Sequence, residues 1–238
     1  MTETRDIGAP VQGWQEPPCP PRAEMMGRYV RLEPLSRTHA AEIHAAFEGA
    51  DGAWDWMPYG PFATEDAYGD WIDSVSGGND PLFFALRDLA SGKALGAASY
   101  LRIAPSAGSI ELGHIALSPA LQQSRAATEA WFLMMDWAFS SGYRRFEWKC
   151  NALNLPSRRA AQRLGLSFEG IFRQAAVIKG HNRDTAWFAA IDGEWPALRA
   201  AFQSWLDPAN FAPDGQQRES LSRLTHSLLV STDPQLGP

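Results

Sequence analysis

The hydrophobic residues of the chain recur with two different periods, which divide it into strand-like and helix-like segments. Alternating apolar and polar positions predict strands at 29–35, 82–89, 94–103, 109–117 and 145–150, and a hairpin over 168–192 that turns near Gly180. Apolar residues three and four positions apart predict helices at 38–49, 64–75, 125–141, 155–164 and 193–206. The expected order is strand, two helices, three strands, helix, strand, helix, hairpin and a last helix.

The predicted helix at 125–141 indicates the fold class. It is apolar almost all round, so it must be buried on every side. The residues that make it so are Trp131, Phe132, Leu133, Met134, Met135, Trp137 and Phe139. A central mixed sheet covered by helices on both faces accommodates such a helix. We therefore expect an α/β fold of the α+β kind.

Three regions are expected along the chain. Residues 1–26 contain five Pro and little periodicity, which indicates an extended arm. One main domain follows over 27–206, and 207–238 forms a tail with a short amphipathic helix. Its apolar face would dock on a partner or on its own domain. The residues of this face are Leu221, Leu224 and Leu228.

Composition limits the class of protein. The 238 residues are 45% hydrophobic and include ten Trp, enough to bury one sizeable core. No run of about 18 apolar residues and no secretory signal pattern occurs, so we expect a soluble cytoplasmic protein without a membrane partner. The net charge of −6 argues against nucleic-acid binding and is compatible with a cationic substrate. Cys19 and Cys150 form no close-spaced pair, which fits a reducing compartment and predicts no metal site.

The turn QQSRAATEA, residues 122–130, leads into the buried helix. A strand, a short polar turn and a helix form a common phosphate site, because free N–H groups and the positive helix end converge there. Ser124 is the expected N-cap, and Arg125 would place a cation in the first turn, which is unfavourable unless an anion lies there. The turn has no glycine, but Ala126 and Ala127 let a ligand approach their N–H groups.

A second junction of the same kind follows the strand at 145–150. Asn154 can cap the next helix, and three Arg follow at 158, 159 and 163. Two helix N-termini with basic residues nearby would suit a long, multiply phosphorylated ligand. The alternatives are a surface pair of Arg125 with Glu129 at the first junction and a solvated arginine face at the second.

An ordered set of motifs runs through these segments. It comprises Glu111-x-Gly113, Thr128-Glu129-Ala130, Asn154-x-x-Ser157, Gly165, and Phe168-Glu169-Gly170 with Arg173 three residues on. With these motifs, residues 27–193 resemble the GNAT superfamily of acetyl-CoA-dependent N-acetyltransferases. They are most similar to its ribosomal-protein N-terminal acetyltransferase branch.

The resemblance implies a mostly antiparallel sheet of about seven strands, in which the strands 109–117 and 145–150 splay apart. The pantetheine arm of acetyl-CoA would insert between them, and its pyrophosphate would rest on N–H groups from Ser124 to Thr128. The residues expected to bind the coenzyme are Ile115, Leu117, Gln122, Ser124, Arg125, Ala126, Ala127, Thr128, Asn154, Ser157 and Arg158. Arg125 departs from the family pattern, which has a glycine there.

The implied reaction is direct attack of an amine on the thioester, without a metal. A primary amine with a pKa of about 10 is mostly protonated at pH 7, so a base or a water relay is needed. Glu111 and His114 are the candidate bases, and a bulge at Gly113 would let them converge. The alternatives are an ion-paired Glu111 and a core or rim His114. Ser157 would act at the thiol end or only bond to its own helix.

The acceptor would bind beside the loop between the first two helices, where aromatic faces and a carboxylate suit an ammonium group. The residues concerned are Trp54, Asp55, Trp56 and Tyr59; alternatively, the Trp residues only anchor the loop in the core. Ala175 to Val177 replace the acidic residue expected of the ribosomal-protein enzymes, so we expect a small-molecule or peptide amine. A non-catalytic acyl-CoA-binding module and a protein-interaction domain are the competing functions, and a homodimer is compatible with each.

Overall fold

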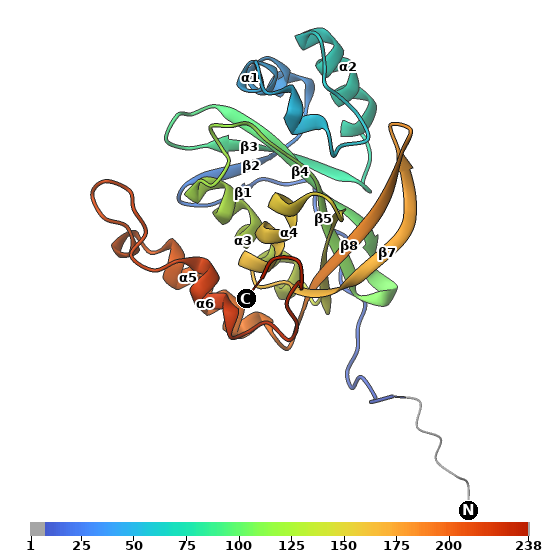
Figure 1. Cartoon of the computed structure of the whole chain (residues 1–238), viewed down its shortest axis with the longest axis vertical. Helices are drawn as coiled ribbons and strands as arrows, with labels where there is room; N and C mark the ends of the chain where they lie inside the picture. Colours follow the sequence, from blue (N-terminus) through green and yellow to red (C-terminus); the bar gives the residue numbers. More distant parts are fainter. Residues whose placement is uncertain (1–7, 238) are drawn as a thin grey trace, which may run out of the picture.

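The computed structural model describes residues 8–237, and one eight-stranded sheet forms its centre (Figure 1). In spatial order the strands are β1 Met25–Met26, β2 Val30–Pro34, β3 Leu82–Asp88, β4 Ala94–Ala104, β5 Ser109–Leu117, β6 Arg145–Asn151, β8 His181–Ile191 and β7 Ser167–Ile178. Neighbouring strands are antiparallel except β5 and β6, which run parallel. The mixed, mostly antiparallel sheet is confirmed. The strand beyond the expected seven is β1, which at two residues is too short to show a period.

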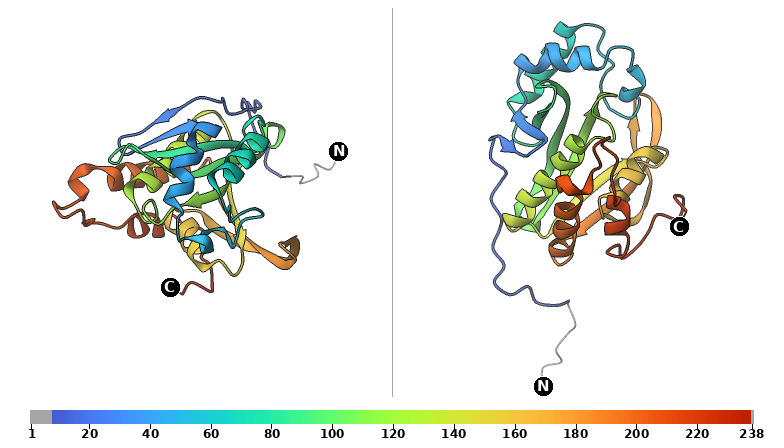
Figure 2. Two further views of the ribbon diagram at one scale, coloured as in Figure 1. Left: turned by 90° about the horizontal axis from the view of Figure 1, so that it is seen from above. Right: turned by 90° about the vertical axis from the view of Figure 1, so that its left-hand side faces the viewer.

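Helices cover both faces of the sheet (Figures 1 and 2). One face carries α1 Ala40–Ala46 and α2 Glu65–Ser76, and the other carries α3 Arg125–Ser140, α4 Leu155–Arg163, α5 Trp195–Leu206 and α6 Leu221–His226. Short 3-10 turns lie at Arg37–His39, Asp51–Trp54, Pro105–Ala107 and Pro208–Asn210. The first helix is shorter than the predicted 38–49, because both of its ends tighten into 3-10 geometry. Within residues 8–237, no helix is long and apolar enough to cross a bilayer.

The helix α3 is the centre of the larger core. Ala130, Met134, Met135 and Ala138 are fully buried between the sheet and α5, as the all-round apolar pattern predicts. Its N-cap is Ser124, whose hydroxyl accepts a hydrogen bond of 3.0 Å from the Ala127 N–H. The sequence therefore determines both the position and the start of this helix.

The tail packs on its own domain. Leu221 of α6 is fully buried, and Leu224 and Leu228 pack against the larger core. The Thr225 hydroxyl donates to the carbonyl of Arg163 in α4 at 3.0 Å. Of the two roles predicted for this apolar face, docking on the same chain is the one observed.

The N-terminal arm runs along the outside of the domain (Figure 2). It is held by the Arg22 guanidinium, which donates to the carbonyls of Ser76 and Gly78 at 2.5 Å each, and by the Tyr143 hydroxyl, which donates to Pro18 O at 3.1 Å. Residues 1–7 of the predicted arm lie outside the described residues.

Candidate active site

The parallel strands β5 and β6 separate along their length. They pair only from Ser109 to Leu112, opposite Arg145 to Trp148. Beyond Leu112, β5 keeps its partner β4 but leaves β6, so one edge of β5 is open. The splay predicted for these strands is present.

A β-bulge lies at the point of separation. Ala97 and Ser99 of β4 pair with Ala116 and Gly113 of β5, so one extra residue is inserted in β5. His114 adopts a φ of +51°, an uncommon value for a residue with a side chain. The bulge was predicted at Gly113, and the residue that takes the left-handed conformation is the next one.

The bulge places the two candidate bases on the same face of the sheet. Ser99 pairs with both Phe83 and Gly113, so these residues share a face, and Glu111 shares it two positions before Gly113. The His114 ring lies on that face as well, because its centroid is 5.1 Å from that of Phe83. Without the bulge, alternation would direct His114 to the opposite face.

Glu111 is buried and ion-paired. Its carboxylate lies 2.7 Å from the Arg102 guanidinium and 2.9 Å from Lys149 Nζ. Burial raises the pKa of Glu111, and the charges and hydrogen bonds of Lys149 and Arg102 only partly offset this. The ion-paired arrangement expected as the alternative is therefore present, and an amine would reach this carboxylate only through water.

His114 is neutral at pH 7. Burial, with the charges of Arg102 and Arg183, lowers its pKa to about 4. Its Nδ1 lies 3.1 Å from the Tyr59 hydroxyl, and the two rings stack with centroids 5.6 Å apart. The imidazole is held in place and can accept a proton, but its low pKa makes it a weak base.

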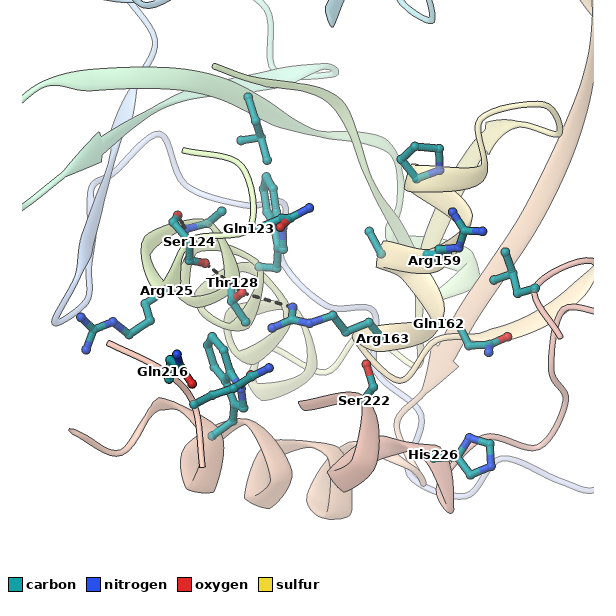
Figure 3. A pocket seen from close by; sticks show the side chains of 18 of the residues that line it. Gln123, Ser124, Arg125, Thr128, Arg159, Gln162, Arg163, Gln216, Ser222 and His226 are labelled. Atoms are coloured by element: carbon teal, nitrogen blue, oxygen red, sulfur yellow. Dashed lines mark hydrogen bonds between the residues drawn. The ribbon is translucent and has the colours of Figure 1, made fainter. Parts of the chain in front are cut away.

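A groove of about 1360 Å³ opens beside α3 and α4 (Figure 3). The first turn of α3 and the outer face of α4 line it, together with the C-terminal segment. Its polar wall contains Gln123, Ser124, Arg125, Thr128, Arg159, Gln162, Arg163, Gln216, Ser222 and His226. Both strand-to-helix junctions identified in the sequence thus face one groove.

The turn before α3 presents fewer free N–H groups than predicted. The Ala127 N–H is used by the Ser124 hydroxyl and the Thr128 N–H by the Ser124 carbonyl. Across residues 8–237 no acceptor is found for the N–H groups of Arg125 and Ala126. These two remain for an anion.

Arg125 does not form the surface ion pair with Glu129 that was the alternative expected for this residue. Its guanidinium lies over the rings of Tyr29 and Phe211, at 5.0 and 4.6 Å from their centroids. Figure 3 shows it on the opposite side of Thr128 from Arg163. Glu129 instead accepts hydrogen bonds of 2.6 to 3.0 Å from three backbone N–H groups at residues 28–30. The Thr-Glu-Ala motif therefore anchors the start of β2 to α3.

Arg163, like Arg159, is a cation in the groove that the site prediction omitted. Its Nη1 donates to the Thr128 hydroxyl at 3.3 Å, and its guanidinium lies 4.9 Å from the centroid of the Trp205 ring (Figure 3). Burial lowers the pKa of Arg163, and no carboxylate in the described part of the chain pairs with it. The signal in the sequence was that Arg163 is one of the three Arg that follow the second strand-to-helix junction.

Arg158, predicted as a coenzyme ligand, is turned away from the groove. It is 1% exposed and forms a bidentate pair with Asp233, with both bonds 2.5 Å long. It also donates to Ala152 O and Gln235 Oε1. Its guanidinium is thus used by the tail, a contact too distant in sequence to be recognised from spacing.

The remaining predicted coenzyme residues take local roles. Asn154 Oδ1 accepts from the Ser157 N–H at 3.1 Å as the cap of α4, and Ser157 Oγ accepts from Trp148 Nε1 at 3.0 Å. Gln122 Nε2 donates to the Leu117 carbonyl at 3.1 Å, and Ile115 lies in the part of β5 that does not pair with β6.

Within the described chain, no cluster of three or more His, Cys, Asp or Glu side chains forms a metal site.

A second cavity, of about 490 Å³, lies between the loop after α1 and the β7–β8 hairpin. Arg183 lines it from β8. Of the four residues predicted for the acceptor, Asp55 and Trp56 line it and Tyr59 does not. Trp54 does not, because it is 4% exposed and packs among aromatic rings in the smaller core. Lys179 ties the hairpin to the loop by donating to the Trp54 and Gly60 carbonyls at 2.9 and 2.8 Å.

Comparison with known proteins identifies the family. Residues 30–167, more than half of the chain, match the family model described as acetyltransferase (GNAT) domain. This chain belongs to the GNAT acetyltransferase family. A solved GCN5-related N-acetyltransferase from Brucella melitensis is 49% identical, with a TM-score of 0.88 over 91% of this chain and 100% of that chain. No curated protein matches.

Two further acetyltransferase structures are similar. An acetyltransferase of the GNAT family from Chromobacterium violaceum is 41% identical, with a TM-score of 0.75 over 80% of this chain and 96% of that chain. The microcin C7 self-immunity acetyltransferase MccE, solved with acetyl-CoA and AMP, is 19% identical, with a TM-score of 0.62 over 69% and 93%. At that identity MccE shows the shared fold alone.

The GNAT assignment makes the protein an acyltransferase, and GNAT acetyltransferases use acetyl-CoA as donor. Such an enzyme has to bring a long anionic coenzyme and an amine to one point. Here the larger groove and the second cavity lie on two sides of the splayed strands, with Glu111 and His114 on the strand between. Their residue sets do not overlap, so the two openings are separate.

Proposed function

We propose that the protein transfers the acetyl group of acetyl-CoA to a primary amine of a small molecule or a peptide N-terminus, by direct attack of the amine. The observation that supports this best is the separation of β5 from β6 beyond Leu112, beside a groove that contains the half-buried Arg163, which pairs with no carboxylate in the described part of the chain. An extended thioester fits such an opening, because amides can pair with the free edge of β5.

The phosphates of the coenzyme would bind at the first turn of α3. The free N–H groups of Arg125 and Ala126 and the positive end of a 16-residue helix favour an anion there. Arg163 adds a full charge from the facing helix, and the desolvated guanidinium gains a partner when a phosphate binds. The pyrophosphate is thus held from two helices.

The acceptor amine would approach from the second cavity. It must be neutral to attack the thioester carbon, and positive charge near it favours the neutral amine. The structure has this positive potential, because burial, with a smaller contribution from the charges of Arg102 and Arg183, lowers the pKa of His114 to about 4. In this proposal Glu111 and His114 organise a water relay that removes the proton, and Ser157 lies near the departing thiol.

Two measurements separate this proposal from a non-catalytic acyl-CoA-binding module. Acetyl-CoA should raise the melting temperature, because a ligand that binds only the folded state stabilises it. Release of coenzyme A should then require one class among amines, amino acids, polyamines and peptides. A thermal shift without thiol release from any amine would support the binding module, and no shift at saturating acetyl-CoA would exclude both.

The ribosomal-protein branch is not part of the proposal. Residues 175–177 are Ala, Ala and Val, so the acidic residue expected for that substrate is missing. A small or short acceptor also fits a second cavity of about 490 Å³ better than a folded protein partner does.

A further inference from the structure

Arg183 in β8 lines the second cavity, and the proposed reaction gives its side chain no binding role. It is half-buried and lines that cavity together with Asp55, Asn151 and Asn182. A guanidinium has five N–H donors and stays charged in proteins, so withdrawing it from water is costly unless an anion compensates. The contacts of the Arg183 guanidinium therefore show whether an anion in the protein already compensates its charge.

Arg183 has no such partner. Throughout residues 8–237 its guanidinium makes no ion pair or hydrogen bond, and its buried Nε has no acceptor. Burial lowers the pKa of Arg183. The neighbouring Asp184 is engaged elsewhere, because its Oδ1 accepts from the Gln174 N–H at 2.7 Å and from Asn182 Nδ2 at 3.0 Å.

The ion-pair network behind Arg183 has no free carboxylate to offer. Glu111 is shared by Arg102 and Lys149, and Glu147 is shared by Lys149 and Arg145. Adding Glu169, which pairs with Arg145, gives three carboxylates for three cations, and Arg183 is a fourth cation. These carboxylates are engaged by Arg102, Lys149 and Arg145, and Asp55, which lines the same cavity, forms no ion pair with Arg183 in the described part of the chain.

Arg183 also lies close to the reacting centre. It is among the charges that lower the pKa of His114, and Glu111 and Cys150 act on its own pKa. An anion bound by Arg183 would thus lie within electrostatic range of a group placed beside His114 at the open edge of β5. A molecule that spans this interval has an oxyanion at one end and an amine at the other.

We propose that the acceptor carries a carboxylate or similar oxyanion close to its amine, as an amino acid does, and that Arg183 binds this group. The proposal rests on the proposed function and narrows its acceptor from any primary amine to an anionic one. The coenzyme does not account for Arg183, since its phosphates have Arg163 and the α3 turn in a groove that shares no lining residue with the second cavity.

The test uses matched acceptors and the full chain. Coenzyme A release is measured with phenylalanine, phenylalaninamide and phenethylamine, and with trios built on other side chains. Phosphoethanolamine against ethanolamine distinguishes a phosphoryl group from a carboxylate. The amine of the amide is less basic than that of the acid, so a larger fraction of it is neutral and reactive at pH 7. A preference for the acid therefore does not arise from amine reactivity.

We expect kcat/KM for the acid to exceed that for its amide by about 10- to 100-fold, the worth of one charge-assisted contact. Arg183→Gln should abolish this preference, and Arg183→Lys should keep part of it. The control is Arg223→Gln on α6, which removes the same charge from a side chain that is 80% exposed. It should leave the preference unchanged.

Two outcomes overturn the inference: wild-type protein acetylates the amides as well as the acids, or Arg183→Gln slows every member of a trio equally.

If no amine is acetylated, the proposed function fails, and a binding measurement tests the inference separately. N-acetylphenylalanine should then raise the melting temperature in the presence of coenzyme A, its amide should not, and Arg183→Gln should lose the rise. Equal rises, or none, would also count against it. If Arg183→Gln does not fold, Arg183→Lys and the wild-type ranking still decide.

Discussion

The guanidinium of Arg158 in α4 donates two hydrogen bonds to the carboxylate of Asp233 in the tail, and both side chains are buried. This pair joins the last described segment of the chain to α4, which lines the larger groove. Since α6 and the segments around it line the same groove, the tail is an integral part of the groove wall.

Asp233→Asn should destabilise the fold by about 3 to 5 kcal/mol, because it leaves a buried guanidinium without its counter-charge. Denaturant unfolding measures the loss. Glu219→Gln is the matched control, because it removes the same charge from an exposed pair with Arg223 at 3.5 Å, worth about 0 to 1 kcal/mol. An Asp233→Asn loss no larger than that of the control would contradict the structural role assigned to the pair. Replacing Arg158 and Asp233 together by Met should recover much of the stability.

Arg163→Gln should weaken acetyl-CoA binding by about 10-fold or more, through loss of a charge-assisted contact to phosphate. The same change should alter the melting temperature of the free protein little, because relief of the guanidinium's desolvation offsets the lost hydrogen bond to Thr128 and the lost contact with Trp205. Thermal shift with and without acetyl-CoA measures both.

Arg125→Gln provides the comparison at the same groove. Its guanidinium stacks on Tyr29 and Phe211, so the variant should lose stability in the free protein as well as part of the acetyl-CoA shift. Arg125→Glu, which also repels phosphate, should lose most of it. Equal losses of free-protein stability in Arg163→Gln and Arg125→Gln would argue against the distinction drawn between the two side chains.

His114 should make the protein less stable as the pH falls from 6.5 to 4. Its pKa is about 4 in the folded state against 6.5 for an unperturbed histidine, so the unfolded chain binds more protons in this interval. His114→Asn, which tolerates a positive φ, should flatten the pH dependence of the unfolding free energy there. Parallel curves for the wild type and the variant would show that His114 titrates normally. The rate of acetyl transfer should show no inflection from His114 between pH 5 and 8.

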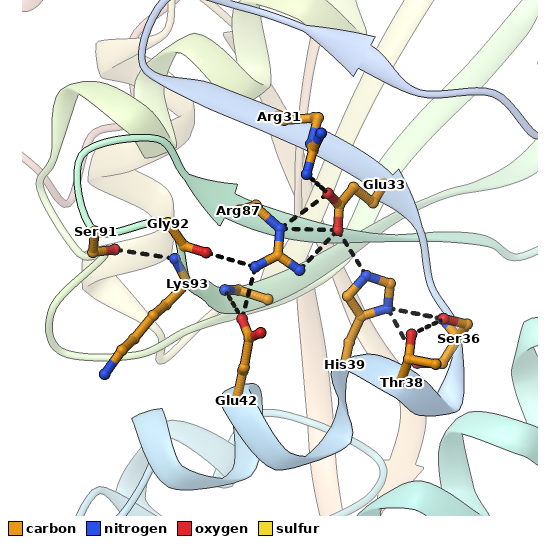
Figure 4. Close-up of polar contacts among 11 residues, drawn as sticks. Arg31, Glu33, Ser36, Thr38, His39, Glu42, Arg87, Ser91, Gly92 and Lys93 are labelled. Carbon is orange, nitrogen blue, oxygen red and sulfur yellow. Dashed lines mark hydrogen bonds and ion pairs between the residues drawn. The ribbon is translucent and has the colours of Figure 1, made fainter.

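Glu33 should contribute stability that is present above pH 4.5 and is lost as the pH falls toward 2. It lies in a cluster with Arg87 and His39, whose nearest atoms are 2.9 and 2.8 Å from its carboxylate (Figure 4). Burial raises the pKa of Glu33, but the hydrogen bonds and charges of Arg87, His39 and Arg31 outweigh it and lower the pKa to about 2.

Glu33→Gln should therefore cost about 1 to 3 kcal/mol at pH 7 and almost nothing near pH 2, where the wild-type carboxylate is protonated as well. Unfolding in denaturant at both pH values gives the comparison. A cost that stays the same at the two pH values would mean that packing, and not the charge of Glu33, is responsible.

The order of the elements followed from hydrophobic periodicity, because each helix or strand buries one face and so repeats apolar residues at its own period. The caps at Ser124 and Asn154 were predictable for a similar reason, since a cap bonds to an N–H only three residues away. The two-residue β1 was missed, and the ends of α1 were misplaced, where the signal is too short to show a period.

Individual roles within the candidate site were harder to predict. Arg158, Arg159 and Arg163 follow one another on α4, yet one binds the tail, one lines the groove from an exposed position and one is a desolvated cation within it. Helical spacing alone does not assign these roles, because the direction of each side chain depends on residues up to 77 positions away.

The sequence by itself determined the element order, the two helix N-termini and the family motifs, since all of these depend on neighbours within a few residues. Only the tertiary structure decided that Arg158 is buried against Asp233, that a bulge turns His114 toward the face of Glu111, and that Arg183 is left without an anion. Each of these depends on charge and burial set by segments distant in the chain, and a charge acquires or lacks a partner only once the chain has folded.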